Sequence, residues 1–256
     1  MDYVEAGLLI ILVAAGSVIV ADLFRRALGF DLRRRQHEVG KQLYPQIGVL
    51  FAVLLAFMFS EVFGEYNAAA QAINGECGAL HGAAMLANDL SDGEGKAVEQ
   101  AILDYSRIVV SAEWQTLSHR QPSVDAQNAF QNIVLAAGRL NPTHSTDSAI
   151  QSQLLSLISQ AHAFRETRLF QANQGLPLTN WGVLLFYSLL LVAFVLFAGI
   201  ESRVAHLFFT AAISTSVILV LIVVRMLDYP FEGALTLSNA AFIKTIGLVS
   251  ALAGGS

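Results

Sequence analysis

The charged residues best placed to do chemistry in this sequence lie inside apolar patterns, where an unpaired charge is costly. Glu61 and Arg225 each fall near the end of a long apolar run, and ionisable residues inside a membrane usually face the protein interior and pair. We therefore expect Glu61 and Arg225 to be partners or to share a polar network. The alternative is that each side chain extends separately to the membrane surface.

A second charged group falls in a polar region between two apolar runs. Glu76 lies 12 residues after Gly64, and Arg168 lies 13 residues before Trp181. At about 1.5 Å per helical residue, both stand roughly 18 to 20 Å from the membrane. A buried charge without a partner costs several kcal/mol, so we expect a Glu76 to Arg168 ion pair with Arg165 nearby. Its expected role is to fix helix register, and ligand binding is the alternative.

The apolar run that holds Glu61 carries two further patterns. A small residue stands at every fourth position: Gly48, Ala52, Ala56, Ser60 and Gly64. Such a stripe allows another helix to approach closely in lipid. Phe57, Phe59 and Phe63 add aromatic bulk. In an oligomer they would form an apolar constriction that gates by dewetting, whereas simple exposure to lipid is the alternative.

Other kinds of chemistry have no support in the sequence. The six histidines show no metal-ligand spacing, and the single cysteine, Cys77, can form neither an intrachain disulfide nor a thiolate metal cluster. No glycine-rich phosphate loop, HExxH or GxSxG motif is present. We expect no enzyme, no cofactor and no bound metal. The net charge of -5 also argues against a general nucleic-acid role.

The elements that must position these residues are membrane helices. The chain is 55% hydrophobic and only 14% charged, whereas soluble domains carry about 25% charged residues. Four segments approach the roughly 20 apolar residues that a span requires. They are Gly7–Phe24, Ile47–Gly64, Trp181–Ile200 and Val204–Leu227. The first lacks a preceding basic segment, so we expect a retained helix and not a cleaved signal peptide.

The basic residues predict the orientation in the membrane. The connection 25–46 between the first two spans, expected to be a loop, holds six of the fifteen lysines and arginines. Positive charge stays cytoplasmic. This predicts a multi-pass inner-membrane protein with both termini and the segment 65–180 outside the cytoplasm.

The segment 65–180 is helical by its pattern of apolar residues. Four amphipathic stretches, Ala69–Leu90, Val98–Trp114, Ala126–Leu140 and Ile150–Arg168, are separated by turn residues. Short connections favour an antiparallel four-helix bundle. Its first helix continues the second span without a break, so that 44–90 forms one long helix. The final apolar stretch, Ala240–Leu252, is too short to span comfortably and is expected either at the membrane surface or packed on the bundle.

The predicted fold is therefore all-α and polytopic, with an antiparallel four-helix bundle inserted between membrane helices. Its parts are the first two spans (1–64), the bundle (65–180), the last two spans (181–227) and a C-terminal turn with its apolar segment (228–256).

Several of these residues, in this order and spacing, resemble the bestrophin-like domain family. They are Phe51, Ala52, Glu61, Glu76, Leu80, Tyr105, Glu113, Trp114, Arg165, Arg168, Pro177, Trp181, Asp228, Pro230, Phe231 and Gly233. The resemblance covers most of the chain and implies a distant relation to bestrophins, which are oligomeric anion channels. In bestrophins the corresponding soluble helices are cytoplasmic, which is opposite to the prediction from the basic connection; we follow the charge rule.

Two functions remain open at this stage. The first is a homo-oligomeric ion channel in the lipid bilayer, with the second span nearest the pore. The second is a non-conducting membrane sensor or assembly factor whose extracytoplasmic bundle binds a ligand or a partner protein.

Overall fold

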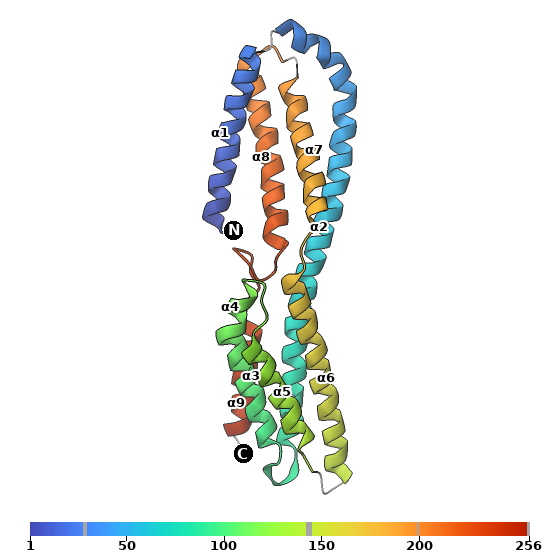
Figure 1. Cartoon of the computed structure of the whole chain (residues 1–256), viewed down its shortest axis with the longest axis vertical. Coiled ribbons are helices and arrows are strands. Elements are labelled where there is room, and N and C mark those ends of the chain that lie inside the picture. The colour runs from blue at the N-terminus through green and yellow to red at the C-terminus, as the bar shows by residue number, and fades with distance from the viewer. Residues whose placement is uncertain (28–29, 142–144, 199, 255–256) are drawn as a thin grey trace. The chain divides into compact units, whose positions relative to one another are not determined.

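The computed structural model describes residues 1–27, 30–141, 145–198 and 200–254, and for residues 30–42 it describes the backbone alone. The described residues form helices joined by turns (Figure 1). The helices are α1 (Tyr3–Ala27), α2 (Phe30–Asn88), α3 (Lys96–Ile108), α4 (Trp114–Leu117), α5 (Val124–Gly138), α6 (Ser145–Asn173), α7 (Leu178–Leu196), α8 (Arg203–Leu227) and α9 (Ala240–Gly254). They divide into two compact units, which we describe separately.

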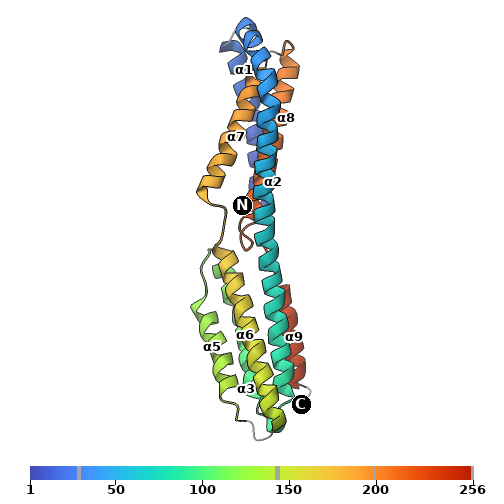
Figure 2. The ribbon, with the colours of Figure 1, turned by 90° about the vertical axis from the view of Figure 1, so that its right-hand side faces the viewer.

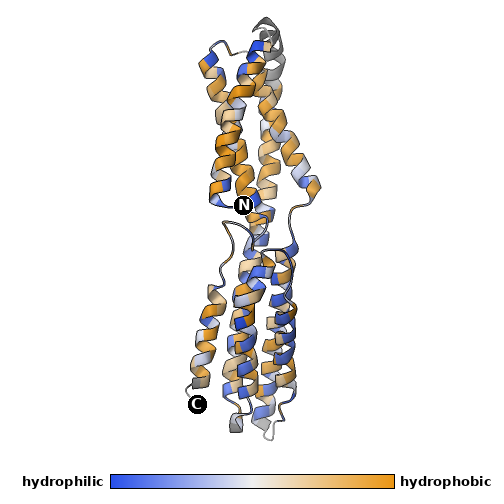
Figure 3. Ribbon diagram, turned by 60° about the vertical axis from the view of Figure 1, so that its left-hand side comes forward, coloured by the Kyte–Doolittle hydropathy of each residue, from blue (hydrophilic) through white to orange (hydrophobic). Residues whose placement is uncertain are grey.

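Unit 1 comprises Met1–Gly64 and Gly175–Asp228. It contains α1, the first part of α2, α7 and α8, the four described helices that are long and apolar enough to cross a membrane. The α1 helix packs on α8, and α7 packs on α8. Figure 3 shows that most of the residues visible along these helices are apolar. Such helices are suited to lipid, so the prediction of four candidate spans is confirmed.

A small apolar core holds unit 1 together. It is formed by Phe51 of α2, Leu184 and Leu191 of α7, and Leu221 of α8. Gly48 lies close to this core, because a Cβ atom added to it would meet the Leu191 side chain at 4.0 Å. The predicted small-residue stripe therefore meets α7 only at Gly48. Ala52, Ala56, Ser60 and Gly64 are exposed in the single chain.

The connection between the first two spans is mostly helical, which corrects the expectation of a loop over 25–46. The α1 helix extends to Ala27 and α2 begins at Phe30. A loop was expected because this segment joins two spans, but arginine, glutamine, glutamate and leucine are all good helix formers. The α2 helix also continues through Pro45. The predicted basic side chains of Arg33, Arg34, Arg35 and Lys41 lie outside the described residues.

Unit 2 comprises Glu65–Gln174 and Tyr229–Ser256. The second part of α2 packs with α3, α5, α6 and α9 around one apolar core. The α3 helix packs against α5 and α9, and α5 packs against α6. Figures 1 and 2 show α9 on the side of this unit opposite α5 and α6. Of the two expectations for the last apolar segment, packing on the bundle is therefore the one observed: Phe242 and Val249 of α9 have no exposed surface.

Two local features of unit 2 concern the packing of α2 on α6 and the start of α5. Gly75 of α2 lies against the ring of Phe164 in α6, and a Cβ atom at this position would come within 2.6 Å of that ring. A larger residue at position 75 would therefore have to displace the Phe164 ring. At the start of α5, the Ser123 hydroxyl accepts a hydrogen bond from the backbone N–H of Ala126, which satisfies one of the free donors at a helix N-terminus.

Candidate functional site

Five polar side chains meet in the core of unit 2, and none of them has exposed surface. They are Glu76 of α2, Tyr105 of α3, Glu113 at the end of the helical segment that follows α3, and Arg165 and Arg168 of α6. We call these five residues the buried charge network. With two carboxylates and two guanidinium groups, its formal charges balance.

Arg168 is the centre of the network. Its Nε atom donates to Glu76 Oε2 at 2.8 Å, and its Nη2 atom donates to Glu113 Oε2 at 2.8 Å. The Tyr105 hydroxyl donates to Glu76 Oε1. Arg165 donates from Nη2 to Glu113 Oε1 at 2.7 Å. Each carboxylate therefore accepts charge-assisted hydrogen bonds at both of its oxygens, which is the condition under which a buried ion pair is tolerated.

The protonation states of two network members, Arg168 and Tyr105, are strongly fixed. Burial by itself lowers the pKa of Arg168, but the adjacent Glu76, Tyr105 and Glu113 side chains raise this pKa well above its usual value. The pKa of Tyr105 is also raised well above its usual value, first by burial and then by the charge of Glu76. Arg168 is therefore cationic and Tyr105 neutral at physiological pH. A network held in this way is suited to fixing structure and not to exchanging protons.

A local widening of the helix brings Glu113 into the network. Residues Val109–Glu113 form a π-helical turn between α3 and α4. Eight residues separate Tyr105 from Glu113, and in an α-helix this spacing would rotate the second side chain by about 80° from the first. The wider i to i+5 turn removes part of that rotation, so both side chains point to Arg168.

Two buried donors of the network have no hydrogen-bond partner: Arg165 Nε and Arg168 Nη1. The guanidinium carbon of Arg168 lies 5.4 Å from the centroid of the Phe242 ring and 5.9 Å from that of Trp114. Attraction between a cation and an aromatic face offsets part of the cost of the missing hydrogen bond at Arg168. The α9 helix therefore covers the network with an aromatic side chain.

The structure brings together Glu76 and Arg168, the pair predicted from the sequence. Arg165 is nearby as expected, but its carboxylate partner is Glu113 and not Glu76. Sequence reasoning missed Glu113 and Tyr105 as members of the network, because a π-turn has no recognisable sequence pattern. Their place in the family pattern was the signal that could have found them.

The structure of the single chain does not bring Glu61 and Arg225 together. Glu61 is exposed, and no hydrogen bond or ion pair involves its carboxylate among the described residues. Phe57, Phe59 and Phe63 are also exposed, at 66%, 38% and 47% of their surface. The Phe59 and Phe63 rings stack with their centroids 6.0 Å apart. Glu61 and these rings therefore share an uncovered part of α2.

Within the described residues, no group of three or more histidine, cysteine, aspartate or glutamate side chains is arranged to hold a metal ion. Cys77 and His81, which lie four residues apart on α2, therefore have no third metal ligand beside them there.

Unit 1, with its four apolar helices, makes this chain a multi-pass membrane protein, and its described fold is all-α. The bestrophin-like domain matches residues 11–242. The chain therefore belongs to the bestrophin-like domain family.

Solved structures show the same fold. A point variant of a bacterial bestrophin homolog from Klebsiella pneumoniae aligns with a TM-score of 0.76 at 12% identity, covering 96% of this chain and 99% of that one. The structure of the Klebsiella pneumoniae homolog solved by Zn-SAD phasing aligns with a TM-score of 0.74 at 13% identity, covering 96% and 98%. At this identity the likeness concerns the fold. Comparison with curated proteins finds no significant match.

Proposed function

We propose that this chain forms a homo-oligomeric ion channel in which α2 lies nearest the pore. The observation that carries the proposal is Glu61, an exposed carboxylate on the membrane-spanning part of α2 with no partner among the residues that the structure describes. A carboxylate facing lipid costs at least about 2.5 kcal/mol at the centre of a bilayer and less toward the end of a span, where Glu61 lies, but it stays unfavourable there. Facing a water-filled lumen formed by several copies removes that cost.

The residues around Glu61 support an oligomer. Ala52, Ala56 and Ser60 are exposed, and small side chains allow helices of neighbouring copies to approach closely. Phe57 has 66% of its surface exposed. A ring of such side chains around a lumen would make an apolar constriction of the kind that gates by dewetting.

Two arguments about the permeant ion give opposite predictions. The relation to bestrophins favours anions. A ring of Glu61 carboxylates would instead favour cations at its own level in the pore. Selectivity is therefore the decisive measurement for the pore assignment.

The test is ion flux and single-channel current through purified protein in liposomes, first for the wild type and then for Glu61→Gln. We expect a conductance in the wild type and, in the variant, a permeability ratio shifted toward anions. Glu5→Gln, on α1 near the chain end, is the matched control and should leave the ratio unchanged. Impermeable liposomes, or identical conductance and selectivity in wild type and Glu61→Gln, would reject the pore role of α2.

Assembly is tested separately by cross-linking and mass measurement in detergent. Ala56→Trp places a bulky ring in the small-residue stripe, so we expect a loss of oligomer. Leu185→Trp on α7, where the native side chain is 55% exposed, is the control and should retain it. A strictly monomeric wild type would make a shared pore impossible.

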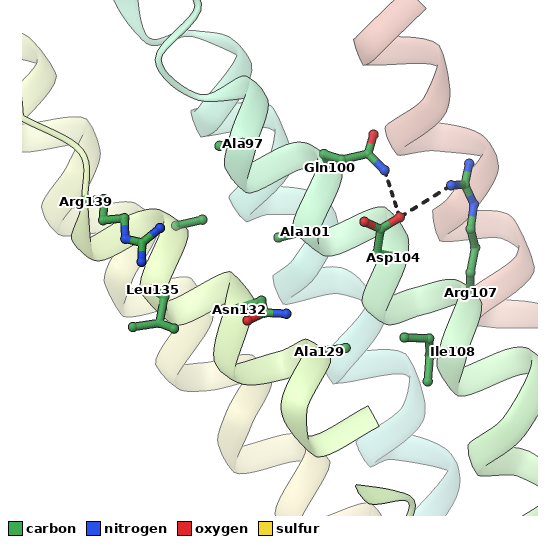
Figure 4. Close-up of a pocket in the computed structure, with 11 residues that line it drawn as sticks. Ala97, Gln100, Ala101, Asp104, Arg107, Ile108, Ala129, Asn132, Leu135 and Arg139 are labelled. Carbon is green, nitrogen blue, oxygen red and sulfur yellow. Dashed lines mark hydrogen bonds and ion pairs between the residues drawn. The ribbon is translucent and has the colours of Figure 1, made fainter. Parts of the chain in front are cut away.

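A second candidate function is that of a non-conducting sensor or assembly factor. The observation in its favour is two grooves on unit 2, of about 760 Å³ between α3 and α5 and about 530 Å³ between α5 and α6. Figure 4 shows the first groove, whose polar lining residues include Gln100, Asp104, Arg107, Asn132 and Arg139. Two results together would favour this function. Liposomes that contain the protein would be impermeable to ions, and a partner protein would copurify with the wild type but not with Ala101→Trp, which fills this groove.

For orientation, the proposal follows the basic residues. Arg25 and Arg26 lie in the last turn of α1, and the connection after them carries four further basic residues. The charge rule assigns this end of unit 1 to the cytoplasm. Both termini and the bundle would then lie outside the cytoplasm of an inner-membrane protein.

A further inference from the structure

The end of unit 1 where α1 finishes and α8 begins gathers three arginines from distant parts of the sequence. Asp22 forms ion pairs with Arg26 Nη2 and with Arg203 Nη2, each at 2.7 Å. It also accepts a hydrogen bond from Arg203 Nε at 2.9 Å. Arg25 donates to two backbone carbonyls of the α7–α8 connection, at 3.0 and 2.5 Å. We call Arg25, Arg26 and Arg203 the arginine cluster. Its side chains are held in place before any ligand arrives.

The cluster keeps an excess of positive charge directed outward. Arg26 and Arg203 share the Asp22 carboxylate, so these three residues carry a net charge of +1, and Arg25 raises it to +2. The side chains of Arg26 and Arg203 are 69% and 58% exposed, whereas that of Asp22 is only 19% exposed. A guanidinium has five N–H donors, and Asp22 engages only one or two atoms of each. Because both side chains are more than half exposed, their remaining donors are accessible from outside the protein.

Apolar surface lies directly beside these donors. On α1, Leu23 and Ile19 occupy the same face as Arg26, at helical spacings of three and seven residues, and are 59% and 60% exposed. On α8, Val204 and Phe208 share a face just after the arginine and are 77% and 66% exposed. Each exposed guanidinium therefore stands at the end of an apolar stripe on a membrane helix. This arrangement matches a molecule with an anionic phosphate at one end and hydrocarbon at the other.

We propose that the arginine cluster binds the headgroup phosphate of an anionic phospholipid, with the acyl chains lying along α1 and α8. Arginine is suited to this role because its planar fork pairs with two phosphate oxygens at once. Basic side chains at the membrane boundary also attract anionic lipid over zwitterionic lipid. The site is independent of the pore proposal, because it lies on α1 and α8 and needs a single chain.

The test uses the full chain purified in detergent. Native mass spectrometry and thermal unfolding are measured with phosphatidylglycerol, with phosphatidylcholine of the same acyl chains, and with soluble glycerol phosphate. We expect bound phosphatidylglycerol and a rise in melting temperature that weakens at high salt. Each arginine near an anionic surface contributes roughly fivefold in affinity, so Arg26→Gln with Arg203→Gln should weaken retention by about 25-fold.

Three comparisons decide the result. Arg107→Gln, on the exposed surface of unit 2, should bind lipid as the wild type does. Arg26→Lys with Arg203→Lys keeps the charge but not the fork, so we expect an intermediate loss. If the double glutamine variant fails to fold, single Arg26→Gln takes its place and should lose about fivefold. Equal phosphatidylglycerol binding by wild type and glutamine variants would overturn the proposal, as would an equal effect of glycerol phosphate, which would indicate a free-phosphate site.

Discussion

At the scale of single residues, the buried charge network is stable only as a whole. Replacing one member leaves the opposite charge buried with too few partners, and this costs about 3–5 kcal/mol. Glu76→Gln keeps the shape of the side chain but leaves Arg168 with Glu113 as its only carboxylate partner. We therefore expect the free energy of unfolding to fall by about 3–5 kcal/mol, measured by denaturant unfolding in detergent.

The matched control for this substitution is Glu166, which lies on α6, the helix that carries Arg165 and Arg168. The Glu166 carboxylate is 3.8 Å from Arg165 Nη1, but its side chain is 57% exposed. Exposed pairs contribute little, so Glu166→Gln should change the free energy of unfolding by less than about 1 kcal/mol. Equal losses in the two variants would mean that the network is not buried in the folded protein.

Cys77 offers a second prediction at this scale. Burial raises the pKa of its thiol from 9.0 to about 12, and the adjacent Glu76 adds to this effect. Because the thiolate is the reactive form, native protein at pH 8 should react with iodoacetamide far more slowly than protein in denaturant. The sign for stability follows: unfolded Cys77 loses its proton first, so stability decreases between about pH 9 and pH 12. Equal alkylation rates with and without denaturant would contradict the burial.

At the scale of elements, α9 contributes Phe242 and Val249 to the unit 2 core. The Phe242 ring lies 6.0 Å from Trp114 and 6.5 Å from Tyr105, measured between centroids. Truncating a buried phenylalanine costs about 3–5 kcal/mol, so Phe242→Ala should lower the melting temperature clearly. Its neighbour Ile243 is 55% exposed, and Ile243→Ala should have a small effect. The reverse order would indicate that α9 leaves the bundle for the membrane surface.

What the sequence predicts well at this scale is set by periodicity and hydropathy. The spans and bundle helices repeat their apolar residues over many turns, so their existence follows directly. Two features escape this reasoning. The connection 25–46 was expected to be a loop because it joins two spans, although many of its residues favour a helix. The π-turn at Val109–Glu113 depends on tertiary partners, since Glu113 is drawn inward by Arg165 and Arg168.

The candidate site was predictable where opposite charges occupied positions that the helical pattern reserves for apolar residues. Glu76 and Arg168 each interrupt an apolar pattern, and a buried charge demands a partner. Glu61 and Arg225 follow the same rule, yet Glu61 has no partner in the described part of its own chain. A single sequence does not distinguish a partner within the chain from one in a neighbouring copy or from a lumen, so the rule identified the residue but not its surroundings.

At the scale of the whole molecule, orientation in the membrane is the property on which the charge rule and the relation to bestrophins disagree. Ser152 of α6 is exposed on unit 2, and the native Cys77 is buried with a raised pKa. Ser152→Cys therefore provides one reactive thiol against an inert background, with the wild type as its control. We expect a maleimide that does not cross membranes to label the variant in intact cells with a permeable outer barrier. The reason is that the charge rule predicts the basic connection in the cytoplasm and unit 2 outside it.

The contrary outcome is equally informative. If Ser152→Cys reacts only after the inner membrane is opened, unit 2 lies in the cytoplasm as the corresponding helices of bestrophins do, and the six basic residues of the connection 25–46 lie outside. Six positive charges on the outer side would then oppose the usual determinant of topology, which acts most strongly through short loops near the span ends. Neutralising Arg33, Arg34 and Arg35 together distinguishes the cases: it should weaken the predicted orientation and mix the labelling, whereas a topology set by other parts of the chain would be unaffected.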